Sequence, residues 1–216
     1  MNAPKRIWTY VLAGSLLVFA PILAGVGRQN SDAAKTNTQQ ASAERDGGHD
    51  FDPLIGQWKF HLKRLLHPLT GSNEWVEMEG TGACYKVFDG RAQLDTVELD
   101  GPTGHIEGLT LRTYDPQSHQ WRLYWANSKT GKLDPPQVGE FKNGRGEFYA
   151  QDTIDGKTIL IRYVWTNLTT NSPHFEQSFS DDGGKTWEVN WITDQTRISD
   201  EVGKTRLFGA LNSFDA

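Results

Sequence analysis

The chain has 216 residues, a mass of 24.2 kDa and a pI near 5.7, which is enough for one domain with a substantial core. Charged residues make up 23 % and hydrophobic residues 37 %, a balance that excludes collagen-like, wholly disordered and multi-span membrane proteins. The 22 Gly, 8 Trp, 6 Tyr and 10 Phe favour many short strands with tight turns. We therefore expect a β-rich domain.

The start of the chain has the pattern of an export segment. Lys5 and Arg6 precede an uncharged, mostly apolar run of 21 residues from Ile7 to Gly27. Because this run approaches the length that spans a bilayer, residues 1–28 are interpreted as a signal peptide or, as the less favoured alternative, a retained N-terminal membrane anchor. We expect the rest of the chain to be exported, periplasmic or secreted, with membrane attachment through residues 7–27 if the segment is retained.

The next segment divides the export region from the domain. Residues 29–50 contain no aromatic residue and no Ile, Leu, Val or Met, so they are predicted to be a disordered linker. The domain is placed at residues 51–198 and a C-terminal tail at residues 199–216. Without Lys5 and Arg6 the chain has 20 basic and 27 acidic residues and no basic cluster, which argues against a nucleic-acid partner.

Ten apolar or aromatic segments follow residue 56, separated by turn sequences such as Asn143-Gly144 and Asp155-Gly156. Closing consecutive antiparallel strands into a barrel removes the unpaired edges of an open sheet. The sequence therefore predicts an all-β fold, a single antiparallel up-and-down barrel of about ten strands, with a two-sheet sandwich as the alternative. The predicted strands are 57–66, 75–85, 91–99, 106–114, 120–128, 137–141, 146–151, 158–167, 174–180 and 188–197, and a short helix is predicted around Leu207, Phe208, Leu211 and Phe214.

Four segments resemble a known family. Pro53-Leu54-Ile55-Gly56-Gln57-Trp58 resembles the Gly-x-Trp signature at the first strand of lipocalins and other calycins. The segments GLTLRTYDP at 108–116, WRLYW at 121–125 and SDDGGKTW at 180–187 are similar to an uncharacterised family of secreted bacterial lipocalin-like domains. The resemblance implies a calycin-type barrel that binds a small molecule, with Trp58 packed at its closed end. It transfers no catalytic residue.

One turn has a recognisable pattern of its own. The sequence Ser180-x-Asp182-x-Gly184-x-Thr186-Trp187 matches the Asp-box, a turn found in sialidases and other propeller enzymes, where it is scaffold. We expect Asp182 to accept hydrogen bonds from turn N–H groups, Gly184 to allow positive φ, and Trp187 to pack the hairpin. A single copy in a chain of this length argues against a sialidase.

Histidines and paired acids raise the question of a metal, a haem or acid–base chemistry. Only His61, His67 and His174 could converge on one site, and His174 would be the first candidate haem ligand. Nothing around these histidines resembles an established metal or haem motif, so no metal and no cofactor are expected. Glu77 and Glu79 share one face of a strand, which is interpreted as a solvated face.

Polar residues inside apolar strands are the candidate anchors for a ligand. Such residues are Arg64, Arg112, Arg162, Glu176 and Gln177, and a wide barrel could turn them inward. Arg162 and Glu176, on successive strands, could form an internal ion pair that grips a polar head group. An ion pair on the outer surface is an equal alternative, because a shift of one residue in register exchanges the two faces.

Aromatic residues supply candidate walls for the same pocket. Trp121 and Trp125 share one strand face, Tyr163 and Trp165 share another, and Trp191 lies in the last strand. These rings could stack an aromatic or lipidic ligand or a sugar, or they could simply fill the barrel. The predicted ligand-binding set is Arg64, Trp125, Arg162, Tyr163, Trp165, Glu176 and Trp191.

The leading hypothesis for function is an exported, non-enzymatic protein that sequesters or carries a small, largely apolar ligand. One alternative is an enzyme, a hydrolase or isomerase that uses an enclosed carboxylate such as Glu176, and another is an envelope interaction module without a pocket. An acid of raised pKa inside a cavity favours the enzyme, a cavity without such an acid favours carriage, and a filled barrel favours the module. The sequence leaves the oligomeric state open.

Overall fold

The computed structural model describes residues 46–202. The strands within this range match the ten predicted segments, and two short 3-10 helices, η1 (Asp52–Leu54) and η2 (Phe88–Gly90), precede β1 and β3. No helix in this range is long and apolar enough to cross a membrane. The export segment, most of the linker and the predicted terminal helix lie outside the described residues. The strands are β1 (Gly56–Leu65), β2 (Trp75–Val87), β3 (Ala92–Gly101), β4 (Gly104–Asp115), β5 (Gln120–Asn127), β6 (Gln137–Lys142), β7 (Arg145–Ile154), β8 (Lys157–Thr166), β9 (His174–Ser180) and β10 (Glu188–Ser199).

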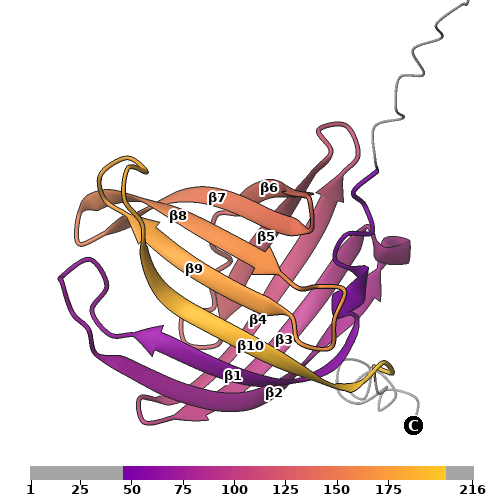
Figure 1. Ribbon diagram of the computed structural model, residues 1–216, viewed down its shortest axis with the longest axis horizontal. Coiled ribbons are helices and arrows are strands. Elements are labelled where there is room, and N and C mark those ends of the chain that lie inside the picture. Colours follow the sequence, from indigo (N-terminus) through magenta and orange to yellow (C-terminus); the bar gives the residue numbers. More distant parts are fainter. Residues whose placement is uncertain (1–45, 203–216) are drawn as a thin grey trace, which may run out of the picture. The chain divides into compact units, whose positions relative to one another are not determined.

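The strands form a closed up-and-down barrel (Figure 1). Every strand pairs antiparallel with its neighbours in the chain, and β1 also pairs with β10, so that Trp58 lies opposite Gly82 on one side and Arg197 on the other. Closure leaves no open edge, which is the physical reason for preferring a barrel to an open sheet. The predicted all-β barrel is confirmed, and the sandwich alternative is wrong.

Alternation along each strand decides which side chains face the interior. In β1 the buried residues Trp58, Phe60 and Leu62 alternate with partly or fully exposed ones. Glycine in the wall makes room for some of the largest rings. A Cβ added at Gly108 in β4 would lie only 2.2 Å from Cη2 of Trp125 in β5, so the indole ring occupies the space that a side chain would need.

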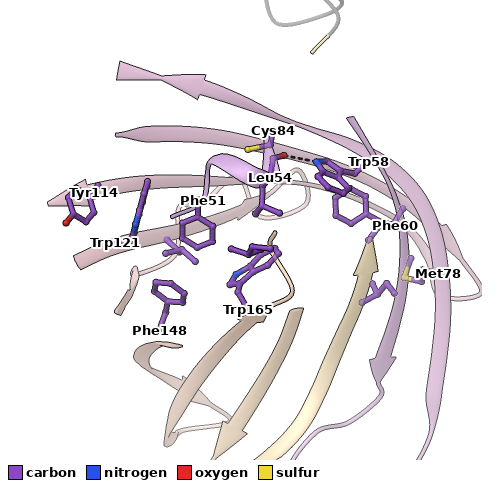
Figure 2. Close-up of a cluster of buried hydrophobic side chains, with 14 residues drawn as sticks. Phe51, Leu54, Trp58, Phe60, Met78, Cys84, Tyr114, Trp121, Phe148 and Trp165 are labelled. Atoms are coloured by element: carbon purple, nitrogen blue, oxygen red, sulfur yellow. Dashed lines mark hydrogen bonds between the residues drawn. The ribbon is translucent and has the colours of Figure 1, made fainter. Parts of the chain in front are cut away.

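An aromatic cluster fills one end of the barrel (Figure 2). Phe51, which precedes η1, is fully buried and inserts among rings carried by several strands. Its ring meets those of Trp121, Phe141 and Trp165 edge-on, at centroid distances of 5.1, 4.9 and 5.9 Å, and stacks on Phe148 at 5.6 Å. The segment before β1 therefore closes this end.

The closed end is also tied together by polar contacts around Trp58. The Trp58 indole Nε1 donates a hydrogen bond of 2.6 Å to the Leu54 carbonyl. The Arg197 guanidinium lies 4.0 Å from the centroid of the Trp58 ring and donates to the carbonyls of Ile55 and Pro53. Trp58 thus joins β1, β10 and the η1 segment.

The last residues assigned to the linker belong to the closed end as well. Residues 47–50 form a turn, in which the Gly47 carbonyl accepts from Trp121 Nε1 at 2.9 Å and the Gly47 N–H donates to the Tyr114 hydroxyl at 3.1 Å. These contacts use backbone groups, which composition does not reveal. The part of the chain that contacts the barrel therefore begins before the predicted boundary at residue 51.

Candidate ligand-binding cavity

The barrel contains a cavity of about 320 Å³. Its lining extends from Arg112 and Trp165, which contact the Phe51 ring of the closed end, to Arg64 and Asp134 near the other end. A cavity of this size lies at the lower end of the range for small-molecule sites. Aromatic and aliphatic side chains form most of its wall, among them Phe60, Leu99, Leu123, Trp125, Ile161, Tyr163, Trp165, Phe175, Phe179 and Trp191.

Five of the seven predicted ligand-binding residues line this cavity. They are Arg64, Trp125, Tyr163, Trp165 and Trp191. The rings of Trp125 and Trp191 meet edge to face at 6.5 Å, and Tyr163 meets Phe175 edge to face at 5.1 Å. The pairing of Tyr163 with Gln177, and of Gln177 with Trp191, brings three inward positions of β8, β9 and β10 into one row.

The other two predicted residues do not line the cavity. The Arg162 guanidinium lies over the Trp187 ring at 4.6 Å, and the Glu176 carboxylate bonds to His174 at 3.1 Å. The register pairs Arg162 with Ser178 and Glu176 with Val164, so both side chains alternate to the face opposite Tyr163. Of the two alternatives, the internal Arg162–Glu176 ion pair is therefore wrong: both residues lie on the outer face, where Arg162 contacts Trp187 and Glu176 contacts His174.

The interior contains a different ion pair, between Arg112 and Asp95. Arg112 is 1 % exposed, and its Nη2 lies 2.6 Å from Asp95 Oδ2. The guanidinium also lies 4.9 Å from the Phe51 ring centroid and 5.3 Å from that of Trp165. The sequence marked Arg112 but not its partner. The available signal for Asp95 was an acid within the apolar run Leu94-Asp95-Thr96-Val97.

Asp95 is the enclosed carboxylate of the cavity. Burial raises its pKa, and this effect outweighs the opposing influence of the Arg112 guanidinium. Its side chain keeps 14 % of its surface accessible, and since Asp95 faces inward in β3 and lines the cavity, that surface belongs to the cavity. Arg112 also approaches the thiol of Cys84, which is buried as expected and whose pKa burial raises to about 12. That thiol is therefore a poor nucleophile.

The wall contains further polar groups, of which the sequence marked only Gln177. The Gln177 amide donates to the Asn190 side chain at 2.7 Å, and Trp191 Nε1 donates to the Thr193 hydroxyl at 2.9 Å. In contrast, Oε1 of the buried Gln137 has no hydrogen-bond partner among the described residues. A buried acceptor without a partner is costly, which marks Gln137 as a position where a ligand donor would be favoured.

Carboxylates and a cation lie near the open end. Asp134 precedes β6 and Asp152 lies in β7, while Arg64 lies near the end of β1. Burial raises the pKa of Asp134, and the neighbouring charge of Asp152 adds to this shift. Burial also raises the pKa of the Tyr163 hydroxyl, and both carboxylates contribute to that shift, so the phenol stays neutral.

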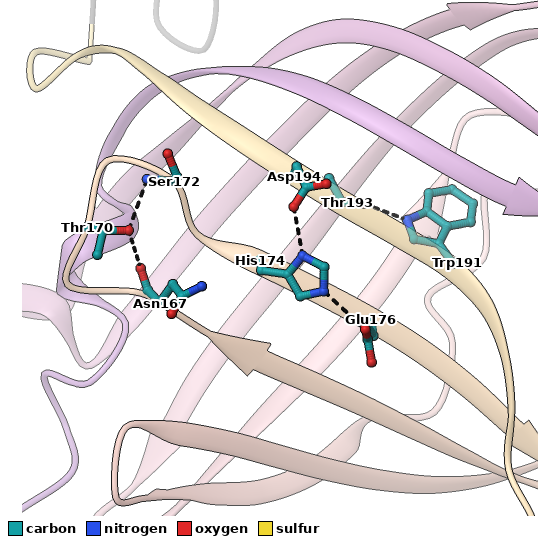
Figure 3. A network of polar contacts seen from close by, with 8 residues as sticks. All are labelled: Asn167, Thr170, Ser172, His174, Glu176, Trp191, Thr193 and Asp194. Atoms are coloured by element: carbon teal, nitrogen blue, oxygen red, sulfur yellow. Dashed lines mark hydrogen bonds and ion pairs between the residues drawn. The ribbon is translucent and has the colours of Figure 1, made fainter.

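The outer wall carries its own charge network (Figure 3). His174 in β9 bonds to Asp194 Oδ1 through Nδ1 at 2.7 Å and to Glu176 Oε1 through Nε2 at 3.1 Å. Both ring nitrogens are thus occupied. Burial lowers the pKa of His174, but the bonds to the two carboxylates outweigh it and the net shift is upward. Within residues 46–202 no group of three His, Cys, Asp or Glu side chains is arranged to hold a metal ion.

The paired acids of β2 lie on the same outer wall. Glu77 contacts His61 and Lys63 at 3.3 and 3.4 Å, and Glu79 contacts Lys59 at 3.1 Å. All of these contacts are exposed to solvent, and exposed ion pairs contribute little to stability. Glu77 and Glu79 are separate from the cavity.

The Asp-box turn after β9 is built by hydrogen bonds to one carboxylate. Asp182 accepts from the backbone N–H groups of Lys185 and Thr186, each at 3.0 Å, and from the hydroxyls of Ser180 and Thr186. These bonds lower its pKa. Gly184 has a φ of +86°, and its carbonyl accepts from Trp187 Nε1 at 3.1 Å. The turn therefore holds Trp187 in place beside Arg162 on the outer face.

In comparisons with known proteins, no protein-family model matches the chain and no curated protein matches its sequence. The fold and the cavity define the protein as a closed ten-stranded up-and-down barrel with an internal, aromatic-walled site. This architecture is compatible with a lipocalin-like binding fold.

Proposed function

We propose that the barrel binds a small, largely apolar molecule in its cavity and thereby sequesters or carries it. The observation that carries this proposal is the 320 Å³ cavity with walls from Trp125, Tyr163 and Trp191. Rigid aromatic rings offer a large contact area at a low cost in conformational entropy. An interaction module without a pocket would have a filled barrel, and the cavity argues against that alternative.

The same proposal places the protein outside the cytoplasm. The support for this is the basic start and apolar run of residues 1–28. In this view the barrel acts in the periplasm or as a secreted protein. If residues 7–27 are retained, the barrel binds its ligand while attached to the inner membrane.

An enzyme remains the second candidate because of Asp95. This carboxylate opens into the cavity and its pKa is raised, which is the property of an enclosed acid or base. Glu176, the acid first considered for that role, lies on the outer face. A raised pKa inside the cavity by itself favours the enzyme, but Arg112 already holds one of the Asp95 oxygens at 2.6 Å, so the carboxylate is engaged in an ion pair and binding without turnover is preferred.

The test uses the neutral apolar dye N-phenyl-1-naphthylamine and the full chain. We expect its fluorescence to rise on binding, with a dissociation constant in the micromolar range. Ala150→Leu places a larger side chain in the cavity and should weaken binding about tenfold by filling the space. Ala126→Leu, on the opposite face of β5 from Trp125, makes the same change outside the cavity and should leave binding unchanged.

Two outcomes decide the proposal. Absence of dye binding, or equal weakening by both variants at equal stability, would count against a ligand-binding cavity. Native mass spectrometry of the protein purified from its own host should show a co-purifying small molecule. If that molecule is converted by the wild type and bound unchanged by Asp95→Asn, the enzyme is the correct candidate.

A further inference from the structure

Three hydrogen-bond acceptors converge on one side of the open end of the cavity. Asp134 lies in the loop before β6, Gln137 begins β6 and Asp152 lies in β7, and all three line the cavity. β6 and β7 pair through Val138 and Tyr149, three residues from Asp152, so Asp152 falls beside the segment that carries Asp134. We call Asp134 and Asp152 the acidic rim, and Gln137 lies beside them.

The acidic rim has no cation of its own. Within residues 46–202 neither Asp134 nor Asp152 forms an ion pair, and Asp152 accepts only the N–H of its neighbour Thr153. Gln137 is 2 % exposed and its Oε1 lacks a donor in the same part of the chain. Gln137 is an observation independent of the two charges, because a buried amide oxygen requires a donor whatever its net charge.

The charges inside the cavity do not compensate the acidic rim. The Arg112 guanidinium is committed to Asp95, and that pair is neutral as a unit. The remaining cation, Arg64, belongs to β1, which is separated from β6 by five steps around the barrel in either direction and so lies on the opposite wall. The β6–β7 side of the open end therefore carries an excess of negative charge.

Aromatic rings complete the surroundings of the acidic rim. The Asp134 N–H donates to the Trp125 carbonyl at 2.8 Å, which joins the Asp134 backbone to the backbone of a residue whose indole lines the cavity. The Tyr163 hydroxyl lies within the electrostatic influence of both carboxylates. The faces of electron-rich rings attract cations, most strongly when these are partly withdrawn from water.

We propose that the ligand of this cavity is an organic ammonium compound with at least one N–H group and an apolar or aromatic body. The ammonium group lies between Asp134 and Asp152 and donates a hydrogen bond to Gln137 Oε1. The body of the ligand lies among Trp125, Tyr163 and Trp191. This inference rests on the proposed function, since it names the chemical class of molecule that the same cavity takes.

The test compares three probes of similar size that differ in charge: 2-phenylethylammonium, 2-phenylethanol and phenylacetate. Each displaces N-phenyl-1-naphthylamine from the full chain, and the ratio of their dissociation constants is measured. We expect the ammonium compound to bind about tenfold more tightly than the alcohol, and phenylacetate to bind most weakly. The preference should shrink as salt is added, because the two carboxylates are at the solvent-exposed rim.

Variants separate the acidic rim from the general charge of the protein. Asp134→Asn with Asp152→Asn should abolish the preference for the ammonium compound over the alcohol. The matched control, Asp89→Asn with Glu201→Gln, removes the same charge at two exposed positions near the closed end, between β2 and β3 and after β10, and should keep the preference. Gln137→Leu should weaken the ammonium compound but not phenylacetate, which has no donor for Oε1.

The outcomes distinguish this inference from the proposed function. If the dye binds but the ammonium compound and the alcohol bind equally, or phenylacetate binds most tightly, the inference is overturned and the cavity function stands. If the dye binds and none of the three probes displaces it, the inference is likewise overturned. If the dye itself does not bind, the proposed function fails and the inference fails with it. Loss of the preference in the rim variant alone supports the inference.

Discussion

Arg112 is a charged residue that lies buried in the interior of the barrel. Arginine is rarely buried without partners, because removing a charge from water costs several kcal/mol. Here the charge is balanced by Asp95 at 2.6 Å and by the faces of Phe51 and Trp165. Its Nε is nevertheless without a hydrogen-bond partner among the described residues. The stability of the folded barrel therefore depends on the presence of both Arg112 and Asp95.

Replacing Arg112 with methionine should leave the Asp95 carboxylate buried without a partner. We expect Arg112→Met to lower the free energy of unfolding by about 3–5 kcal/mol in urea denaturation. The double variant that combines Arg112→Met with Asp95→Leu should recover most of the loss, because no buried charge remains. Lys59→Met, which breaks the exposed contact with Glu79, should change stability by about 0–1 kcal/mol. If Arg112→Met lowered the free energy of unfolding no more than Lys59→Met does, the account of a buried ion pair would be contradicted.

At the scale of the elements, the outer faces of β1, β10 and β9 are joined by a line of titratable groups. Asp194 in β10 lies opposite His61 of β1 and opposite His174 of β9 in the two registers. His174 bonds to Asp194 and to Glu176 on its own strand (Figure 3). These contacts lie beside the β1–β10 pairing that closes the barrel. We therefore expect the protonation of His174 to affect the stability of the folded state.

The raised pKa of His174 predicts a pH dependence of definite sign. The folded state holds this proton more tightly than the unfolded chain, so the stabilisation is complete below about pH 6.5 and is lost as the pH rises through the raised value. Measured by denaturation from pH 5.5 to 8.5, the stability difference between wild type and His174→Gln should fall with increasing pH. Because the group is partly exposed, its size should be below about 1 kcal/mol.

A histidine outside this network provides the control for that series. His67, which is exposed in the β1–β2 loop and has a φ of +57°, can be changed to Asn without backbone strain. His67→Asn leaves both carboxylate bonds of His174 in place, so it supplies the reference series for the His174→Gln profile. A flat profile for His174→Gln, or a slope of opposite sign, would show that the His174 bonds do not stabilise the protonated form.

At the scale of the whole molecule, one cylinder of hydrogen bonds surrounds both the aromatic cluster and the cavity. The cluster around Phe51 is continuous with the cavity wall, since Trp165 belongs to both. Every strand contacts two neighbours, and removing any one opens the closed sheet. Loss of one strand exposes two sheet edges and the apolar interior, which favours cooperative unfolding of the whole barrel.

We therefore expect residues 46–202 to unfold in one cooperative transition. Tryptophans report on both regions, with Trp58 and Trp121 in the closed end and Trp125 and Trp191 in the cavity wall. Tryptophan fluorescence and far-ultraviolet circular dichroism should show the same midpoint in urea. A fluorescence change at lower urea than the loss of β structure would indicate that the cavity end opens separately.

Much of this architecture could be predicted because its signals are local. Turn residues such as Asn143-Gly144 and Asp155-Gly156 mark the ends of strands, and both Asn143 and Asp155 have positive φ in the structure. The prediction that Trp125, Tyr163, Trp165 and Trp191 share one space followed from alternation along each strand. Because hairpins connect consecutive strands, pairing the first strand with the last leaves no strand edge unpaired, and this predicted a closed barrel.

Other features depended on groups that are distant in the sequence. The face of Arg162 and Glu176 was left open because alternation gives two equivalent faces, and only the register with the neighbouring strands chooses between them. The partner of Arg112 was missed for a related reason: Asp95 is 17 residues away, and its approach depends on how β3 and β4 pair.

The sequence by itself determined the number and order of the strands and their closure into a barrel, because short-range turn chemistry and alternation carry that information. The tertiary structure decided which polar side chains face the interior, placed Asp95 against Arg112, and left Gln137 without a donor beside Asp134 and Asp152 among the described residues. The physical reason is that the burial of a polar group and the charge that balances it depend on which strands pair. Neither can be read from the sequence of one strand.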